Sequence, residues 1–296
     1  MTPEGAPPPG AAPWTEEEAI AALAVRAVTH DLAADPGPPW PAPGGAAAFL
    51  ARHFRPDPPQ EIVFTGYYEP VVEVALARGG GFDHPLYALP EGPRPSRAEI
   101  AAGALAGRGL ELAWLRDPLE AFLLQVQGSA RLAIAGGGEL RLGHAGGNGR
   151  PYRSIGAELI RRGAIAPEAM GIAAIRAWAR AHPAEVPDLL LHNPSFAFFR
   201  PVDLPPASGP IGAMGRPVTA GRSLAVDPAE VPLGALVWVE LDAPIRLRRL
   251  MVAQDTGGAI RGARADIFTG TGRAAGRLAG RLRHPGRLAV LRPVGA

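Results

Sequence analysis

Glycine and proline interrupt this chain so often that most of its apolar segments are short. The 296 residues include 38 glycines and 34 prolines, and the glycines follow no three-residue period of the kind found in collagen. This spacing indicates a fold with many turns. Apolar residues still make up 47% of the chain, so we expect a folded protein with a sizeable core rather than disorder.

Short apolar segments follow one another most closely in the C-terminal third of the chain. Stretches rich in glycine and proline separate them, and this succession favours a small closed β-barrel. The change of pattern near residues 200–210 is the best candidate for a domain boundary. We expect strands at TAGRSLAV, ALVWVEL, RLRRLMVAQD and RLAVLRP, with a helix near TGRAAGRLAGRL.

Upstream of that boundary the sequence mixes extended and helical patterns. The β-branched and aromatic segment EIVFTGYYEP (61–70) predicts a strand that ends at proline. The segments AFLLQVQGSARLAI and ELRLGHAG flank the turn GGG (136–138) and are typical of a hairpin. Helices are expected from Thr15 to about Leu32, at SRAEIAAGALAG (96–107), at PYRSIGAELIRRG and at PEAMGIAAIRAWARAH, and NPSFAFFRPV is expected to be extended.

Composition excludes several classes of function. A formal net charge of +2 gives no electrostatic footprint for nucleic acid. The absence of cysteine excludes disulfides, thiolate metal sites and cysteine nucleophiles. The N-terminus carries acidic residues where a signal peptide has Lys or Arg, so the sequence shows no signal peptide pattern. No apolar run reaches 18 residues, so we expect no transmembrane span.

The sequence carries no motif for metal, nucleotide or serine-hydrolase chemistry. Its 7 histidines form neither HExxH nor another close ligand spacing, so we expect no metal ion. The segment DTGGAIRG lacks the ending of a phosphate loop, and neither a dinucleotide fingerprint nor a GxSxG elbow is present, so no cofactor is expected. Carboxylates, amides, hydroxyls and aromatic rings remain, which are the groups that proteins use on sugars.

Two acidic residues flank a flexible loop in the segment AQDTGGAIRGARADIF. Asp255 ends an apolar strand, and Gly257–Gly258 can bring the backbone close to a neighbour or a ligand. Asp266 stands among apolar neighbours, where partial burial would raise its pKa to the range of a general acid at neutral pH. The spacing also fits a structural role, in which Asp255 caps a turn and Asp266 pairs with Arg261 or Arg264.

Asp255 and Asp266, together with Asp227, resemble the three aspartates for which a protein module is named. Upstream segments, in the same order, resemble the membrane-bound lytic murein transglycosylase A family. The resemblance covers residues 60 to 295. Its segments are GYYEP (66–70), AFLLQVQGSARL (121–132), NGRPYRSIGAELIRRG (148–163), AIRAWARAHP (174–183), NPSFAFFR (193–200) and the aspartate module from TAGRSLAV to GRLAVLRP.

This resemblance implies a mainly β fold with helices, of the α+β class, in two domains. A six-stranded double-psi β-barrel would be formed by residues 14–69 and 201–296 and would be catalytic. A second β-rich domain, residues 70–200, would be inserted into the first, with a groove for a glycan strand between them. Residues 1–13, rich in Pro, Ala and Gly, are expected to be flexible.

The resemblance also implies an activity. A lytic murein transglycosylase cleaves the β-1,4 bond between N-acetylmuramic acid and N-acetylglucosamine of peptidoglycan and leaves a 1,6-anhydro end. Carried over by motif, Asp266 is the catalytic acid and Asp255 is its neighbour in the site. One acid suffices because the C6 hydroxyl of the sugar replaces the water or second carboxylate that an ordinary glycosidase uses.

Other polar and aromatic residues are candidates for glycan binding. Gln125, Gln127 and Ser129 alternate along the expected strand, so they could offer one polar face to acetamido groups or simply form an exposed face. Neighbours on a strand point in opposite directions, so only one of Tyr67 and Tyr68 is expected to face a sugar. Aromatic residues at this position also fit the core.

The remaining candidates lie in turns. Tyr152 and Arg153 open an expected helix, where Arg153 could meet carboxylates of the substrate or remain an ordinary surface residue. Gly257–Gly258 could bring the backbone against the substrate. Asp227 is expected to be structural and to accept backbone N–H bonds in a turn.

Three departures from the family pattern bear on function. Thr269 stands where the family often has an aromatic residue, His144 stands where tyrosine is expected, and the cysteine needed for lipid attachment is absent. The family resemblance implies a protein that acts on glycan strands of peptidoglycan in the periplasm or at the periplasmic face of the outer membrane, and the missing cysteine favours a soluble periplasmic enzyme. We also expect a monomer. The alternative is a non-catalytic peptidoglycan-binding module whose acids only hold the loop.

Overall fold

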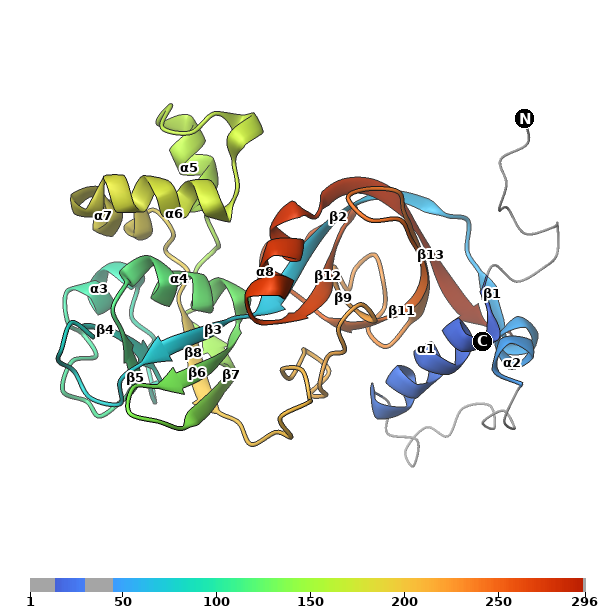
Figure 1. Ribbon diagram of the computed structural model, residues 1–296, viewed down its shortest axis with the longest axis horizontal. Helices are drawn as coiled ribbons and strands as arrows, with labels where there is room; N and C mark the ends of the chain where they lie inside the picture. Colours follow the sequence, from blue (N-terminus) through green and yellow to red (C-terminus); the bar gives the residue numbers. More distant parts are fainter. Residues whose placement is uncertain (1–13, 30–44, 295–296) are drawn as a thin grey trace. The chain divides into compact units, whose positions relative to one another are not determined.

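A computed structural model describes residues 14–29 and 45–294, which divide into two compact units (Figure 1). Unit 1 comprises residues 1–67, 211–270 and 281–296, and unit 2 comprises residues 68–210 and 271–280. Residues 1–13 and the expected helix end near Leu32 lie outside the described residues. Within the described ranges, no helix combines the length and hydrophobicity needed to cross a membrane.

Unit 1 is built around a closed barrel. Strands β9 and β11 are parallel, and the pairs β2–β13, β13–β10, β10–β11 and β9–β12 are antiparallel. A further strand, β1 (Phe54–Pro56), extends the sheet beside β13. The closed sheet confirms the barrel expected at the C-terminal end. The six strands in order around it are β2 (Gln60–Glu69), β13 (Arg283–Pro293), β10 (Leu236–Leu241), β11 (Leu247–Asp255), β9 (Ser223–Val226) and β12 (Arg264–Thr271).

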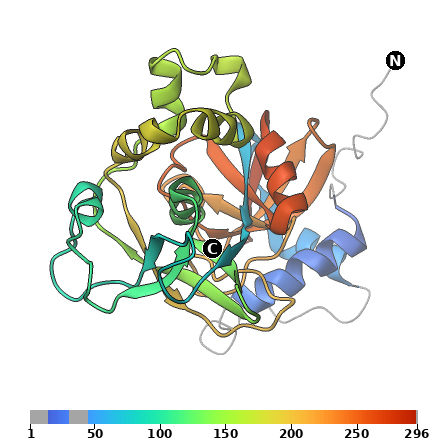
Figure 2. The same ribbon diagram turned by 60° about the vertical axis from the view of Figure 1, so that its left-hand side comes forward.

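Strand β10 is buried on both faces, which explains why its sequence LVWVEL is almost continuously apolar. Leu236 and Trp238 share one core with helices α1 (Glu16–Thr29) and α2 (Ala46–His53), which lie beside the barrel strands in Figures 1 and 2. The alternate residues Val237 and Val239 point to the opposite face, the barrel interior.

Unit 2 is a mixed layer of strands and helices. Strands β3 (Val71–Val74), β6 (Ser129–Ile134), β7 (Glu139–Gly147) and β8 (Ala197–Pro201) form one sheet in that order. The β6–β7 hairpin turns at residues 136–138, as predicted. The other elements are the strand pair β4 (His84–Tyr87) and β5 (Glu111–Leu115), helices α3 (Arg97–Ala101), α4 (Pro118–Gln127), α5 (Ile155–Arg161), α6 (Ile172–Ala181), α7 (Val186–Leu191) and α8 (Gly272–Arg281), and the 3₁₀ turns η1 (Pro167–Ala169) and η2 (Pro183–Glu185).

The chain from residue 121 to 127 is helical, so the strand predicted for this segment is wrong. Asp117 caps helix α4 by accepting a hydrogen bond from the backbone N–H of Leu119 at 2.8 Å, and Pro118 occupies the first turn. Gly128 ends the helix with a φ of 76°, a left-handed conformation that glycine adopts without strain. Only the second half of the segment, from Ser129, is extended.

Helix α4 is apolar on two sides because it is packed on two sides. Ala121 and Leu124 lie in a core with the four-stranded sheet, whereas Phe122 and Leu123 lie in another core with α5, α6 and α7. Figure 1 shows α4 between the sheet and these helices. Burial on both sides removes the polar stripe that normally marks a surface helix in a sequence.

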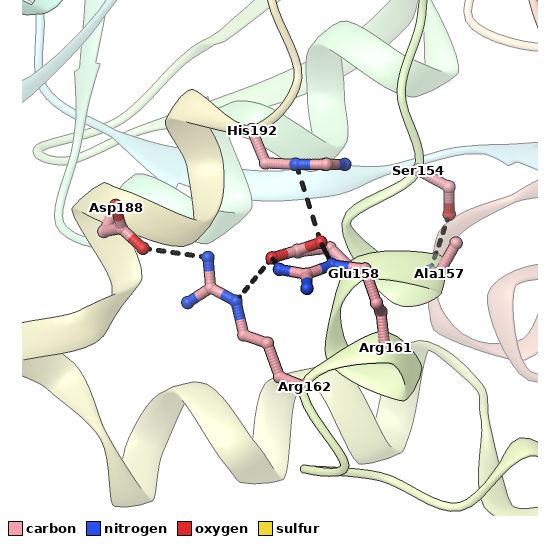
Figure 3. Close-up of polar contacts among 7 residues, drawn as sticks. All are labelled: Ser154, Ala157, Glu158, Arg161, Arg162, Asp188 and His192. Atoms are coloured by element: carbon pink, nitrogen blue, oxygen red, sulfur yellow. Dashed lines mark hydrogen bonds and ion pairs between the residues drawn. The ribbon is translucent and has the colours of Figure 1, made fainter.

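A buried carboxylate connects α5 with α7. Glu158 is 3% exposed and receives hydrogen bonds from Arg161 and Arg162, each at 2.7 Å (Figure 3). Arg162 continues to Asp188 of α7 at 2.8 Å, and Nδ1 of His192 lies 3.7 Å from the Glu158 carboxylate. The arginine hydrogen bonds lower the pKa of Glu158 to about 2. This network fixes the two short helices against each other.

Three short segments, residues 68–69, 201–210 and 271–280, lie in a different unit from the one expected. Residues 201–210, expected in the barrel domain, belong to unit 2 because Val202 and Ser208 bond to its sheet. The N–H of Val202 donates to the carbonyl of Arg141 at 3.0 Å, and the carbonyl of Ser208 accepts from the Arg141 guanidinium at 3.0 Å. Helix α8 also belongs largely to unit 2, where Gly276 packs closely against the ring of Tyr68.

Candidate active site on the barrel

The register of the barrel strands brings the two predicted acids together. Ala225 of the central strand β9 pairs with Asp255 of β11 on one side and with Asp266 of β12 on the other. Residues paired across strands project to the same face, and two strand spacings separate their Cα atoms by about 10 Å. The long glycine loop between the acids thus lets the chain leave β11 and return on the far side of β9.

Asp266 is mostly buried, with 13% of its side chain exposed. Burial raises the pKa of its carboxyl to about 6, and the adjacent Arg264 guanidinium opposes that rise. Its Oδ1 accepts hydrogen bonds from the Thr65 hydroxyl of β2 and, at 3.3 Å, from Nε of Arg264. Its Oδ2 makes no hydrogen bond to any other residue in the described ranges. Both predicted properties are present together: the raised pKa and the contact with Arg264.

Asp255 is held by three hydrogen bonds. Oδ1 accepts from the backbone N–H groups of Ala213 and Thr256, both at 2.9 Å, and Oδ2 accepts from the Tyr67 hydroxyl at 2.9 Å. Burial raises the pKa of Asp255, and these hydrogen bonds oppose the rise. Burial and the Asp255 carboxylate also hold the pKa of Tyr67 well above its ordinary value, so its hydroxyl stays protonated. Tyr67 packs on Phe268, with ring centroids 5.2 Å apart.

The loop between the acids is shaped by close contacts. A side chain at Gly257 would meet Ile260 at 2.9 Å, whereas Gly258 has open space around it. The carboxylate of Asp227 accepts from the N–H groups of Gly262 at 2.9 Å and Ala229 at 3.2 Å, and these bonds lower its pKa. Asp227 therefore has the structural role that was predicted for it.

The sequence did not point to the segment that supports Asp255 from the other side. A Cβ atom at Gly212 would lie 2.9 Å from the Gln254 carbonyl and 3.3 Å from the Asp255 carboxyl carbon. Only glycine permits this approach, which lets the N–H of Ala213 reach the carboxylate. The run PIGAMG could have drawn attention as a glycine-rich turn, but nothing in its composition names the residue that it contacts.

The remaining candidates belong to unit 2, and three of them do not share a strand face. Gln125 and Gln127 lie on helix α4, while Ser129 begins β6 and is 7% exposed. Oε1 of Gln125 accepts from Nη2 of Arg97 at 2.7 Å, and Oε1 of Gln127 accepts from the N–H of Tyr68 at 3.2 Å. The prediction of an alternating polar face is therefore wrong, because the segment is a helix that ends at Gly128.

A buried arginine that the sequence did not single out organises this region. Arg97 lies between the rings of Phe122 and Phe196, whose centroids are 4.7 Å and 4.9 Å from its guanidinium carbon. Its Nε donates to the carbonyl of Asn193 at 2.7 Å, and its Nη2 donates to the carbonyl of Ser195. Burial lowers the pKa of Arg97 to about 10. Arg97 thereby fixes the turn at residues 193–195.

The turn at residues 193–195 holds the segment that contains the last two candidates, Tyr152 and Arg153. Oδ1 of Asn193 accepts from the N–H of Arg153 at 3.1 Å. Tyr152 and Arg153 have exposed side chains and precede α5, whose cap is Ser154. They lie outside the helix that they were expected to open. Among the described residues, no group of three or more His, Cys, Asp or Glu is arranged to hold a metal ion.

Two known protein families match separate parts of the chain. Residues 92–200 match the family described as the MltA specific insert domain, and residues 222–292 match the 3D domain. The membrane-bound lytic murein transglycosylase A of Escherichia coli (strain K12) is 42% identical over 243 residues, which are 78% of this chain and 66% of the relative. The chain thus spans just under two thirds of that protein.

Two crystal structures resemble the fold. E. coli MltA with bound chitohexaose has a TM-score of 0.72 and 40% identity, and the match covers 79% of this chain and 72% of that one. A membrane-bound lytic murein transglycosylase from Agrobacterium tumefaciens has a TM-score of 0.78 and 33% identity, with 95% and 85% covered. The fold, the domain matches and this similarity agree, and the chain belongs to the membrane-bound lytic murein transglycosylase A family.

Proposed function

We propose that this protein is a lytic murein transglycosylase that cleaves the β-1,4 bond between N-acetylmuramic acid and N-acetylglucosamine and leaves a 1,6-anhydro end. The observation that carries the proposal is Asp266, a largely buried carboxyl with a pKa of about 6 and an oxygen without a partner among the described residues. Such a group is partly protonated near neutral pH, which a general acid requires. The named relatives support the same reaction class.

In this mechanism Asp266 acts twice. Its proton passes to the glycosidic oxygen as the bond from that oxygen to C1 breaks, which leaves positive charge on the muramic ring. The resulting carboxylate then takes the proton from the C6 hydroxyl as O6 bonds to C1. Atoms balance without water, and the carboxyl returns to its starting state. Positioned proton transfer of this kind contributes a factor of roughly 10² to 10⁴ in rate.

We assign Asp255 to the charge that develops on the sugar. It lies across β9 from Asp266, and three hydrogen bonds fix its carboxylate in one orientation. A fixed negative group stabilises an oxocarbenium-like ring without having to reorganise as the charge appears. Tyr67 then positions Asp255 through its hydroxyl. The alignment of O6 with C1 would supply much of the remaining acceleration.

The glycan-binding role of unit 2 is part of the same proposal. Tyr152 and Arg153 have exposed side chains on a backbone that the Asn193 turn fixes, so both can contact a ligand. Gln125 and Gln127 have one amide oxygen each in a protein hydrogen bond, which leaves their NH₂ groups as the donors to offer. Gly258, with open space around it, is the loop residue at which a sugar could approach the backbone.

The decisive experiment uses purified protein, isolated sacculi and mass spectrometry of the soluble products. Release of 1,6-anhydromuropeptides by the wild type, and none by Asp266→Asn, is the expected result. Binding to sacculi without any release would favour the non-catalytic module. Products heavier by one water would mean a hydrolase with reducing ends and would reject the O6 mechanism.

We also place the protein at the cell wall, in the periplasm or at the periplasmic face of the outer membrane, as a monomer. The substrate proposed above lies there, and the named relatives are membrane-bound. Fractionation of the native host, followed by detection of the protein, tests the compartment. Light scattering of the purified protein tests the oligomeric state, and a stable dimer would contradict the proposal.

A further inference from the structure

Helix α8 presents three arginines on one face. Arg273, Arg277 and Arg281 are spaced four residues apart and are all exposed. A helix turns about 100° per residue, so this spacing puts the three side chains in one row. Ala275 and Ala279 are buried on the opposite side. We call Arg273, Arg277 and Arg281 the α8 arginine face.

Exposed arginines without an acidic partner occur elsewhere in this protein, but on α8 three of them share one face of a single helix. In the part of the chain that the structure describes, none of the three makes an ion pair or side-chain hydrogen bond, and α8 itself has no acidic residue. Other arginines do have partners. Arg131 and Arg141, for example, both bind the carboxylate of Glu69, at 2.8 Å and 2.9 Å.

The placement also works against the stability of the helix. Like charges four residues apart repel each other, which destabilises a helix by a few tenths of a kcal/mol per pair. Arg273 lies in the first turn, where the positive end of the helix dipole disfavours a cation. Arg281, in the last turn, is the one arginine of the three that the helix dipole favours. An anionic ligand would relieve both the repulsion and the unfavourable position of Arg273.

The helix is rigidly seated and is close in sequence to the proposed acid. Gly276 lies directly against the Tyr68 ring, so a larger residue there would clash. Strand β12, which carries Asp266, runs straight into α8, and only six residues separate Asp266 from Gly272. Six residues of extended chain reach at most roughly 20 Å. The helix therefore continues directly from the strand that carries the proposed acid.

We propose that the α8 arginine face binds the carboxylates of the peptide stems that branch from the glycan strand. This proposal rests on the proposed function, because peptide stems are attached to the muramic acid at the cleaved bond. Guanidinium groups bind carboxylates with paired hydrogen bonds. The arginines repeat about every 6 Å along the helix axis, which suits separate carboxylates along a peptide better than one compact anion.

The test compares two glycan substrates. Sacculi with intact stems are compared with the glycan strands that remain after an amidase has removed the stems, and binding of the full chain is measured over a range of salt concentrations. The variant carries Arg273→Gln, Arg277→Gln and Arg281→Gln. A matched control carries Arg52→Gln, Arg108→Gln and Arg180→Gln, which are exposed arginines without a contact to a described acid.

The α8 variant should bind stem-bearing sacculi roughly tenfold more weakly than the wild type and lose much of the salt dependence. Its binding to stem-free glycan should change less than twofold, and the control should match the wild type on both substrates. Equal losses on both substrates, no loss, or the same loss in the control would overturn the proposal. So would arginine-dependent binding to anionic phospholipid vesicles with sacculus binding unchanged.

This result stays separate from the proposed function. If the wild type released no anhydromuropeptides, the transglycosylase assignment would fail while the binding comparison still decided the role of α8. Thermal unfolding of both variants, expected within 2 °C or so of the wild type, excludes a folding defect as the cause.

Discussion

At the scale of single residues, Asp266 shows how a fold tunes one carboxyl group. Burial of its side chain disfavours the charged form, while the guanidinium of Arg264, whose Nε lies 3.3 Å from Oδ1, favours it. Burial prevails, and the pKa settles near 6. Either influence alone would shift the pKa of the carboxyl away from this value. An unopposed arginine would keep the carboxyl ionised, and burial without the arginine would keep it protonated at higher pH.

Asp266→Asn should therefore abolish catalysis and stabilise the protein at alkaline pH. The folded carboxyl binds its proton more tightly than the unfolded one, so its contribution is complete below about pH 4 and is lost as pH rises through 6. Asparagine does not ionise. We expect Asp266→Asn to exceed the wild type in unfolding free energy by up to about 3 kcal/mol at pH 8, and by little at pH 4. Urea unfolding at the two pH values measures this; a difference independent of pH would contradict it.

Arg264→Gln tests the opposing influence. Removal of the cation should raise the pKa of Asp266, so the fall of kcat/KM on the alkaline side should begin at higher pH than in the wild type. Arg261→Gln is the control, since the Arg261 guanidinium bonds the carbonyls of Gly257 and Ile260 and does not contact Asp266. A pH profile of anhydromuropeptide release gives the answer. If both variants keep the wild-type profile, Arg264 has no part in tuning the acid.

At the scale of helices and strands, the sequence pattern predicted the elements whose conformation depends mainly on local interactions. The β-branched run of β2 and the apolar run of β11 were predicted as strands, and the structure contains both. Helix α4 was missed because packing on both sides gave it a continuous apolar sequence that a buried strand shares. The signals that would have identified it were Asp117, Pro118 and Gly128, a helix cap, start and stop.

The residues of the candidate site fall into two groups, those that the local sequence could identify and those that it could not. Asp255 and Asp266 could be found from their loop and the family motif, and so could Tyr67 from the strand before Pro70. Thr65 could not, because the residue that it contacts lies 201 positions away, and Ala213 reaches Asp255 across 42 positions. Such contacts follow from the closure of the barrel, which no local pattern records.

The α5–α7 connection gives a prediction about an element. Glu158→Gln removes the charge that holds Arg161 and Arg162. A carboxyl with a lowered folded pKa stabilises above its unfolded pKa near 4.3, and this contribution is lost as pH falls toward 2. The variant should thus have a lower Tm than the wild type at pH 7, and the gap should narrow between pH 4.5 and pH 2. Ser154→Ala, which removes only the α5 cap, should give a gap independent of pH.

At the scale of the whole molecule, the chain enters unit 2 twice from barrel strands. It leaves β2 after Glu69, and it leaves β12 after Thr271. The Glu69 carboxylate joins these two places, because it accepts from the Thr271 hydroxyl at 2.8 Å and from the guanidinium groups of Arg131 and Arg141. Glu69 is 1% exposed and Arg141 is 6% exposed, so the pair is shielded from water.

Glu69→Gln should destabilise unit 2 strongly, because two arginines would lose their carboxylate in a site with little access to water. Breaking a buried ion pair from one side typically costs about 3–5 kcal/mol. Thr271→Val removes one hydrogen bond to the same carboxylate and should cost about 1.5–3 kcal/mol. Urea unfolding followed by hydrogen exchange should locate the loss in β6 and β7, which carry the two arginines. If Glu69→Gln proved no less stable than Thr271→Val, the carboxylate would not be the link that holds both chain crossings.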